Sequence, residues 1–246
     1  MPQLKNWDNK TWLSSKEYID SFVKFLIKNK KLNKDSNILD IGCGRGKILG
    51  KIKTKAKLRN KPIGIDPVNH KDKDRNIIFK KIDAFKFLRS NQIKFDLIVI
   101  KQTIHFFPLK DISRLIKYCK NALNNNGKLM IFSINEKRTQ IPTFSKMKKK
   151  LNQSLKKDTE IRKKILKNNK DTKFKIFDFH VKMKRSSYLN MIKQKYISVL
   201  LDFNKNELNK GIKEINIRYP KIIRFIDSLN CLIINQAKLF FLRCFL

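Results

Sequence analysis

The sequence predicts an α/β fold, a doubly wound sheet of seven strands that is mostly parallel, on three observations. Strand-like and helix-like segments alternate five times between residues 36 and 135, as expected of parallel strands joined by crossover helices. Residues 95–100 (FDLIVI) are apolar almost throughout, which is typical of a central strand buried on both faces. Two more strand-like segments follow residue 135, and we expect them to extend the same sheet.

The elements of the first half follow from apolar spacing and from the polar residues that interrupt it. Apolar residues recur every three or four positions over 13–30, which predicts an amphipathic helix. Short apolar runs bounded by Asn, Asp, Gly or Lys predict strands. The expected strands cover residues 37–42, 62–66, 76–82, 95–100 and 128–134, with helices at 47–55, 84–89 and 112–123, the last ended by a turn at 124–127 (NNNG).

The alternation stops after residue 135. Residues 144–170 are rich in lysine and carry an apolar face, which predicts a long helix. Residues 173–183 alternate apolar and polar side chains, as in a strand with one exposed face. Two more helices are expected at 187–201 and 205–218, and a strand at 222–234. This half therefore supplies two strands with helical insertions that cover one edge of the sheet.

A glycine cluster follows the first strand, in the segment 39–46 (LDIGCGRG). Glycines at 42, 44 and 46 let a ligand approach the backbone closely and present amide groups at a helix start. A dinucleotide-binding fingerprint would place glycine at position 47, which is lysine here, and the GK[ST] of a phosphate-binding loop is absent. The pattern therefore argues against a dehydrogenase and against a P-loop enzyme.

Three acids accompany the predicted strands. Asp40 lies in the first strand, Asp66 ends the second, and Asp83 follows the third. The carboxyl ends of parallel strands form the ligand-binding edge of such sheets, where a carboxylate at Asp66 can accept both ribose hydroxyl protons. Asp83 is placed to accept from an adenine amino group between flanking apolar side chains. Each acid taken alone is equally compatible with a turn or a helix cap.

In this order and at this spacing, LDIGCGRG, GID, IDAF, FDLIVI and NGKL resemble the motifs of class I S-adenosylmethionine-dependent methyltransferases, small-molecule branch (type 11/25-like). The resemblance covers about residues 36–135 and implies a Rossmann-like fold, S-adenosyl-L-methionine as cofactor, and methyl transfer. The residues that it assigns to the cofactor are Asp40 at the methionine end, Gly42, Cys43, Gly44, Asp66 at the ribose, Pro67, Asp83 at the adenine, Ala84 and Lys101.

The resemblance also divides the chain, which we expect to form a single methyltransferase domain over residues 1–246. Residues 1–35 are expected to form a helical lid that includes Trp7, Trp12 and Tyr18, although core packing suits these aromatic side chains equally well. Residues 36–135 form the cofactor-binding core. Residues 136–246 supply the cap helices and the last two strands.

The sequence identifies the residues on the acceptor side less specifically than those at the cofactor. His105 follows the fourth strand in the segment KQTIHFFP, and in many small-molecule methyltransferases a similar segment faces the acceptor. His105 is the candidate catalytic base. Lining of the pocket without proton transfer and a packing histidine without a functional role are the alternatives.

Residues 188–212 are similar to the helical cap of trans-aconitate-methyltransferase-like enzymes. An arginine of those caps is replaced by Gln194 or Lys195, so recognition of an acidic acceptor stays open. Lys193, Lys195 and Tyr196 are candidates to line a pocket for a carboxylate, and a solvated helix face is the alternative.

The charge is extreme, with 58 basic and 20 acidic residues and a net charge of +38. It is spread evenly, since residues 1–120 carry +18 and residues 121–246 carry +20. Nucleic-acid binders more often concentrate charge on one face or tail, and abundant Lys, Asn and Ile share codons rich in A and T. A small-molecule acceptor is therefore favoured. A nucleic-acid methyltransferase and a non-catalytic protein of the same fold are the alternatives.

No apolar run is long enough for a membrane span, and the first residues contain no secretory signal. The four cysteines form no CxxC pair and no metal site. These features predict a cytoplasmic protein without a bound metal.

Overall fold

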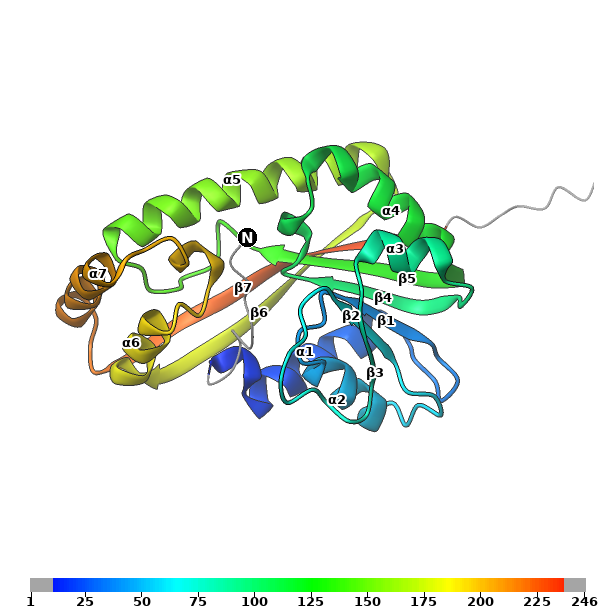
Figure 1. Ribbon diagram of the computed structural model, residues 1–246, viewed down its shortest axis with the longest axis horizontal. Helices are drawn as coiled ribbons and strands as arrows, with labels where there is room; N and C mark the ends of the chain where they lie inside the picture. The colour runs from blue at the N-terminus through cyan, green and yellow to red at the C-terminus, as the bar shows by residue number, and fades with distance from the viewer. Residues whose placement is uncertain (1–10, 237–246) are drawn as a thin grey trace, which may run out of the picture.

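The computed structural model describes residues 11–236, and its centre is one sheet of seven strands in the order β3-β2-β1-β4-β5-β7-β6 (Figure 1). Strands β1 to β5 pair in parallel, and β7 pairs antiparallel with both β5 and β6. The predicted fold class is confirmed. The strands are β1 (Ile38–Ile41), β2 (Ile63–Asp66), β3 (Ile78–Lys81), β4 (Phe95–Lys101), β5 (Leu123–Ile134), β6 (Lys173–Lys184) and β7 (Ile222–Asn235).

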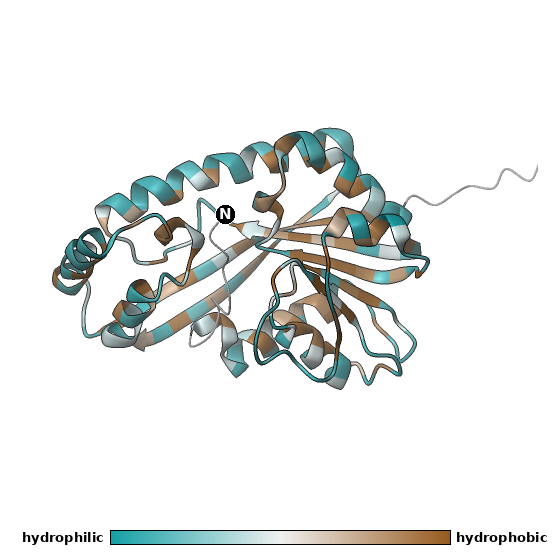
Figure 2. Cartoon of the chain, in the orientation of Figure 1, coloured by the Kyte–Doolittle hydropathy of each residue, from teal (hydrophilic) through white to brown (hydrophobic). Residues whose placement is uncertain are grey.

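The central strands are buried on both faces because helices cover both. Leu97 and Val99 of β4 face one apolar core, and Ile98 and Ile100 face the other. The first core includes α1, α2 and the start of α5, and the second includes α3, α4 and the second half of α5. Apolar residues accordingly concentrate in the strands while the outer helix faces are hydrophilic (Figure 2). These helices are α1 (Lys16–Asn29), α2 (Lys47–Lys55), α3 (Ala84–Ser90), α4 (Ile112–Asn121) and α5 (Ser145–Asn168).

The insertions predicted for the second half are present. Helix α5 connects β5 to β6, while α6 (Arg185–Lys193) and α7 (Lys205–Arg218) connect β6 to β7 and lie at the far end of these two long strands (Figure 1). A capping box starts α7, since Asn204 accepts a hydrogen bond from the Glu207 amide at 2.9 Å and the Glu207 side chain accepts from the Asn204 amide. No helix of residues 11–236 is long and apolar enough to cross a membrane.

Two predicted boundaries are wrong. The helix expected over 187–201 ends at Lys193, because Lys195 adopts a left-handed backbone with φ of 53°. The turn there places the Tyr196 hydroxyl 2.9 Å from that of Tyr188 inside the core. The expected turn at 124–127 is a bulge within β5, since Phe95 pairs with Leu123 and Leu97 already pairs with Lys128.

The start of the described chain packs into the core. Trp12 is buried, and its indole nitrogen donates a hydrogen bond to Asp227 of β7 at 2.8 Å. Tyr18 and Phe22 of α1 contact the Phe177 ring of β6, with centroid distances of 5.8 and 5.1 Å. Trp7 lies outside the described residues. A lid formed by residues 1–35 stays a prediction.

Candidate functional site

A cavity of about 650 Å³ opens at the carboxyl ends of the parallel strands. This is the edge at which open α/β sheets bind ligands, because parallel pairing brings all the strand ends together there. The first half, called the donor half after its expected role, is lined from the ends of β1 to β4. The second half, called the acceptor half after its expected role, is lined from β5, α5, His105 and the segment 197–199. The predicted cofactor residues that line the first half are Gly42, Asp66, Pro67, Asp83, Ala84 and Lys101.

The glycine loop between β1 and α2 approaches the first half of the cavity closely. Gly42, Gly44 and Gly46 have φ of 77°, 55° and 72°, a backbone region that favours glycine. A Cβ on Gly42 would lie 2.3 Å from the Thr103 hydroxyl, so this position excludes any side chain. Gly44 has open space around it. It does not itself line the cavity.

Asp66 holds this loop in place from the end of β2. Its Oδ2 accepts a hydrogen bond from the Gly44 amide at 3.1 Å, and its Oδ1 accepts from the Val68 amide at 2.9 Å. The Nε2 atom of buried His70 lies 3.4 Å from the same Oδ1. Asp66 therefore connects the glycine loop to the loop after β2 and lines the cavity between them.

Asp83 and the residues after it form the opposite wall. Asp83 caps α3, because its Oδ1 accepts hydrogen bonds from the amides of Phe85 and Lys86 at 2.8 and 3.1 Å. Ala84 is buried, and the Phe85 ring lies beside the guanidinium of Arg114 at 4.6 Å. The wall thus combines a carboxylate with a flat apolar surface.

Asp40 and Lys101 interact electrostatically, and of the two only Lys101 lines the cavity. Asp40 is buried in β1 and outside the cavity lining, and its Oδ1 has no hydrogen-bond partner within the described residues. Burial raises the pKa of Asp40 to about 7, opposed by the positive charge of Lys101 and assisted by Asp66. The ammonium of Lys101 donates to Gln102 at 2.7 Å and lies 5.2 Å from the centroid of the Tyr18 ring.

Cys43 packs behind the glycine loop rather than in the cavity. Its sulfur lies 2.7 Å from where a Cβ on Gly64 would stand, so it fills space against β2. Burial raises the pKa of its thiol well above the usual range. At neutral pH Cys43 is therefore a packing residue rather than a nucleophile.

His105 lines the acceptor half of the cavity from η2 (Ile104–Phe106). Its Nε2 is buried and has no hydrogen-bond partner within the described residues. Burial, together with a smaller effect of the Lys157 charge, lowers the pKa of His105 to about 4. The imidazole is therefore neutral at pH 7.

The acceptor half also contains residues that sequence reasoning missed. Leu151, Ser154 and Asp158 enter it from one face of α5, and Ile197, Ser198 and Val199 enter from the turn after α6. One signal was available in the sequence. Asp158 interrupts the apolar stripe of α5, three residues after Leu155 and three before Ile161. Neither Lys193, Lys195 nor Tyr196 lines the cavity.

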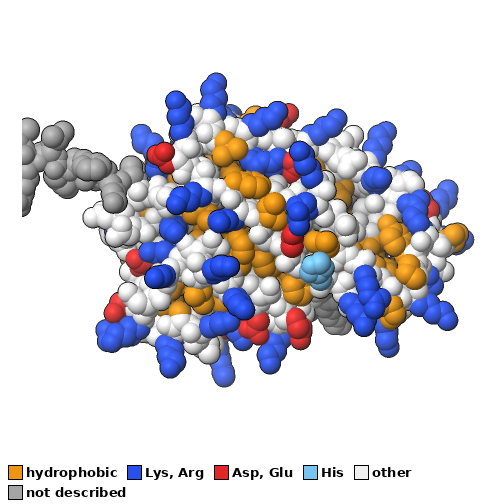
Figure 3. Space-filling model, turned by 180° about the vertical axis from the view of Figure 1, so that it is seen from behind, with side chains coloured by type: hydrophobic (Ala, Val, Ile, Leu, Met, Phe, Trp, Pro, Cys, Tyr) orange, Lys and Arg blue, Asp and Glu red, His pale blue; other side chains and the backbone are white. Residues whose placement is uncertain are grey.

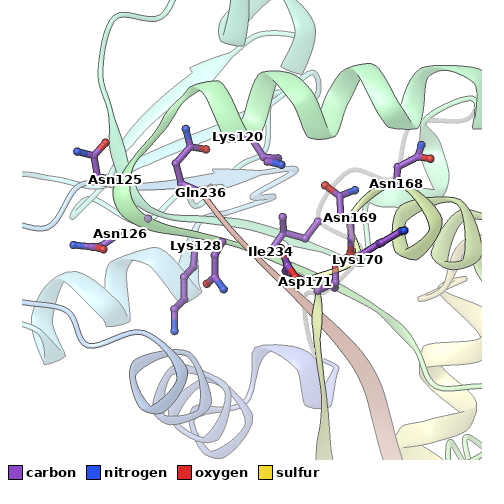
Figure 4. A pocket seen from close by; sticks show the side chains of 13 residues that line it. Lys120, Asn125, Asn126, Lys128, Asn168, Asn169, Lys170, Asp171, Ile234 and Gln236 are labelled. Atoms are coloured by element: carbon purple, nitrogen blue, oxygen red, sulfur yellow. Dashed lines mark hydrogen bonds between the residues drawn. The ribbon is translucent and has the colours of Figure 1, made fainter. Parts of the chain in front are cut away.

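A second hollow, of about 560 Å³, lies at the opposite end of the sheet (Figure 4). Asparagine and lysine side chains surround it, from the 125–128 segment, the end of α5 and the end of β7. It contains none of the predicted site residues. The cavity at the carboxyl ends is therefore the candidate site.

Comparison with known proteins shows the family and the fold of the chain. Residues 12–169 match a family described as a methyltransferase domain. The chain matches no curated protein. Among solved structures, a SAM-dependent methyltransferase from Archaeoglobus fulgidus is similar with a TM-score of 0.54 at 17% identity, covering 94% of this chain and 98% of that one.

A second similar structure is the plantazolicin methyltransferase BpumL in complex with a monoazolic desmethylPZN analog and SAH. Its TM-score is 0.51 at 17% identity, covering 94% of this chain and 87% of that one. At these identities the likeness is one of fold.

Proposed function

This chain belongs to the methyltransferase domain family, and we propose that it transfers a methyl group from S-adenosyl-L-methionine to a small-molecule acceptor. One observation carries the proposal. A single cavity runs from the glycine loop and the β2 and β3 ends, where the family places its cofactor, to a second half walled by the inserted segments.

The residues of the first half fit the cofactor. Gly42 lines this half with its backbone alone, because a Cβ there would collide with Thr103, and the apolar wall at Ala84 and Phe85 suits a flat base. Asp66 is placed for the ribose hydroxyls and Asp83 for the adenine amine. Asp40, Cys43 and Gly44 support the loop from behind, and Pro67 and Lys101 complete the lining.

S-adenosylmethionine supplies an electrophilic methyl group on a sulfonium when bound. The contribution of the chain is to hold donor and acceptor in line, to exclude water, and to receive any proton that the acceptor loses. His105, the predicted base, lies in the acceptor half with an unpartnered Nε2. Its low pKa favours a hydrogen bond to the acceptor over proton removal.

The distribution of charge on the face seen from behind supports a small acceptor over a nucleic acid. Lys and Arg side chains are scattered over the face seen from behind and are interleaved with acidic and apolar side chains (Figure 3). Phosphate-backbone binding would call for a continuous basic surface beside the cavity. The acceptor half instead contains a carboxylate, Asp158, which would repel a polyanion.

Calorimetric titration with S-adenosylhomocysteine tests the donor site. Asp66→Ala should weaken binding about 10- to 100-fold, or roughly 1.5–3 kcal/mol, through lost charge-assisted hydrogen bonds. Asp35→Ala is the matched control, because Asp35 is an exposed carboxylate that pairs with Arg59 at 2.8 Å, outside the cavity. Unchanged affinity in Asp66→Ala would remove Asp66 from the site, and absence of binding to the wild-type chain would reject the donor assignment.

The acceptor class is tested with isotope-labelled S-adenosylmethionine and a whole-cell extract. Products are divided into nucleic-acid, protein and small-molecule fractions, and label is expected in the small-molecule fraction. Label confined to the nucleic-acid fraction would make the nucleic-acid alternative correct.

A further inference from the structure

Asp158 is a buried carboxylate whose position the proposed donor site does not explain. It is 5% exposed, it lines the acceptor half of the cavity, and its Oδ1 has no hydrogen-bond partner within residues 11–236. A buried carboxylate without a partner costs free energy, so proteins seldom keep one unless a ligand satisfies it.

The cations nearest to Asp158 are engaged elsewhere. Arg162, one turn further along α5, donates hydrogen bonds to Glu136, which also accepts from Asn230 at 3.1 Å. The Lys157 ammonium points to η2, where it donates to the backbone oxygen of His105 at 2.8 Å. Both cations stabilise the charged form of Asp158 without bonding to its Oδ1.

The same contacts bring His105 and Asp158 to one region of the cavity. The hydrogen bond from Lys157 to the backbone oxygen of His105 joins α5 to η2. Asp158, which follows Lys157, and His105 line the same half of the cavity. Leu151, Ile197 and Val199 supply apolar surface around them. This half therefore offers a negative carboxylate and a neutral imidazole in an otherwise largely apolar environment.

We propose that the acceptor is an amine on an apolar body, and that Asp158 binds its ammonium and takes the proton released on methylation. This inference rests on the proposed methyltransferase function and names its substrate class and its base. A carboxylic-acid acceptor would place two negative charges together. An aliphatic hydroxyl group is too weak an acid for a carboxylate base, and a neutral phenol brings no positive charge to pair with Asp158.

The transfer balances without any further reactant. The ammonium loses one proton to the Asp158 carboxylate, and the freed nitrogen lone pair forms the bond to the methyl carbon. The sulfur–carbon bond breaks, and its electron pair stays on sulfur as a neutral thioether. The proton leaves Asp158 to water when the product departs.

Ionisation of Asp158 supports this role. Burial raises the pKa of Asp158 to about 6, Lys157 and Arg162 oppose the rise, and Glu136 adds to it. The groups that face it from neighbouring elements are His105 of η2 and Glu136 after β5. Activity on the amine should therefore rise as the pH increases through about 6. Asp158→Asn should abolish this dependence on pH.

The test is calorimetric titration of the protein saturated with S-adenosylhomocysteine. The probes are phenethylamine, 2-phenylethanol and phenylacetate, which share one apolar body and differ in charge. Phenethylamine should bind at least tenfold more tightly than the other two. Asp158→Asn should remove that preference, whereas Glu160→Gln, an exposed carboxylate on the same helix, should keep it.

Equal binding of the three probes, tighter binding of phenylacetate, or an amine preference that survives in Asp158→Asn would overturn the proposal. The labelled small-molecule product gives a second readout, since an N-methyl product is expected and an O-methyl or C-methyl product would also overturn it. Binding of S-adenosylhomocysteine is measured first in every variant. Its loss in the wild-type chain would instead reject the proposed function.

Discussion

At the scale of single residues, the polar groups of the acceptor half are held at a cost to stability. Asp158 is the clearest case, because its pKa is about 6 in the folded chain against an ordinary value of 3.8. The contribution of Asp158 to the free energy of unfolding is full below pH 3.8 and is lost as the pH rises through 6. The proposed binding of an ammonium would offset this penalty.

Asp158→Asn should therefore stabilise the protein at pH 8 by about 2–3 kcal/mol. The stabilisation should shrink as the pH is lowered from 6 toward 4, where the wild-type carboxyl is itself protonated. Denaturant unfolding at a series of pH values measures it. A variant that is less stable than the wild type at pH 8 would show that the carboxylate has a stabilising partner.

His105 gives a second prediction. Its pKa of about 4 means that it is neutral throughout the range from pH 6 to 8. His105→Asn should lower turnover about tenfold, the effect of one lost hydrogen bond, and should leave the pH profile and the affinity for S-adenosylhomocysteine unchanged. Steady-state kinetics across that range decide the matter. A loss above about 100-fold with a flattened profile would make His105 the base.

At the scale of elements, the β1–α2 loop positions the donor half through its backbone. Gly42→Ala combines a strained positive φ with a Cβ 2.3 Å from the Thr103 side chain, whereas Gly44→Ala meets open space. We expect Gly42→Ala to cost more than about 3 kcal/mol of unfolding free energy and Gly44→Ala about 1 kcal/mol. Urea denaturation of the two variants makes the comparison, and equal losses would contradict the close approach.

The donor half was predictable because parallel pairing does most of the placement. Once β1 to β4 are recognised from their apolar runs, the residues at their carboxyl ends meet at one edge, and Asp66 and Asp83 follow. Asp83 also caps α3, which confirms the helix-cap interpretation of that carboxylate, and its role at the adenine stays a proposal.

The acceptor half was not predictable in the same way, because it depends on tertiary contacts. Residues 197–199 reach the cavity only because the helix expected over 187–201 ends early, where Tyr196 packs against Trp12 at 5.2 Å. Apolar spacing contains no sign of this break. Apolar spacing compares residues only a few positions apart, so it misses the contact between Tyr196 and Trp12.

At the scale of the whole molecule, the net charge of +38 gives opposite salt dependences for the two acceptor classes. A cationic amine is repelled at long range, so added salt should raise its association rate. A nucleic acid would bind less tightly as salt increases. Kinetics on the acceptor between low and physiological salt show whether activity rises or falls as salt is added. A steep fall would favour a polyanionic acceptor.

The lysines of α5 provide a matched variant. Lys148, Lys149 and Lys156 are exposed and lie outside the cavity lining. Replacing all three with Gln should leave turnover on the true acceptor within about twofold and weaken non-specific binding of polyanions at low salt. A steep loss of turnover would place a substrate on that surface.

The position of β7 has a consequence for how the protein is made on the ribosome. Of the described strands it is the last in chain order, yet it lies between β5 and β6. Its Asp227 accepts a hydrogen bond from the indole nitrogen of Trp12. During translation, the bare edge of β5 and the indole of Trp12 must wait for residues 222–235 to emerge. Strand β6, whose Phe177 packs against α1, joins the sheet only through β7. A nascent chain halted before that point would expose an unpaired strand edge and a half-built core, which is the form that chaperones retain and that aggregates.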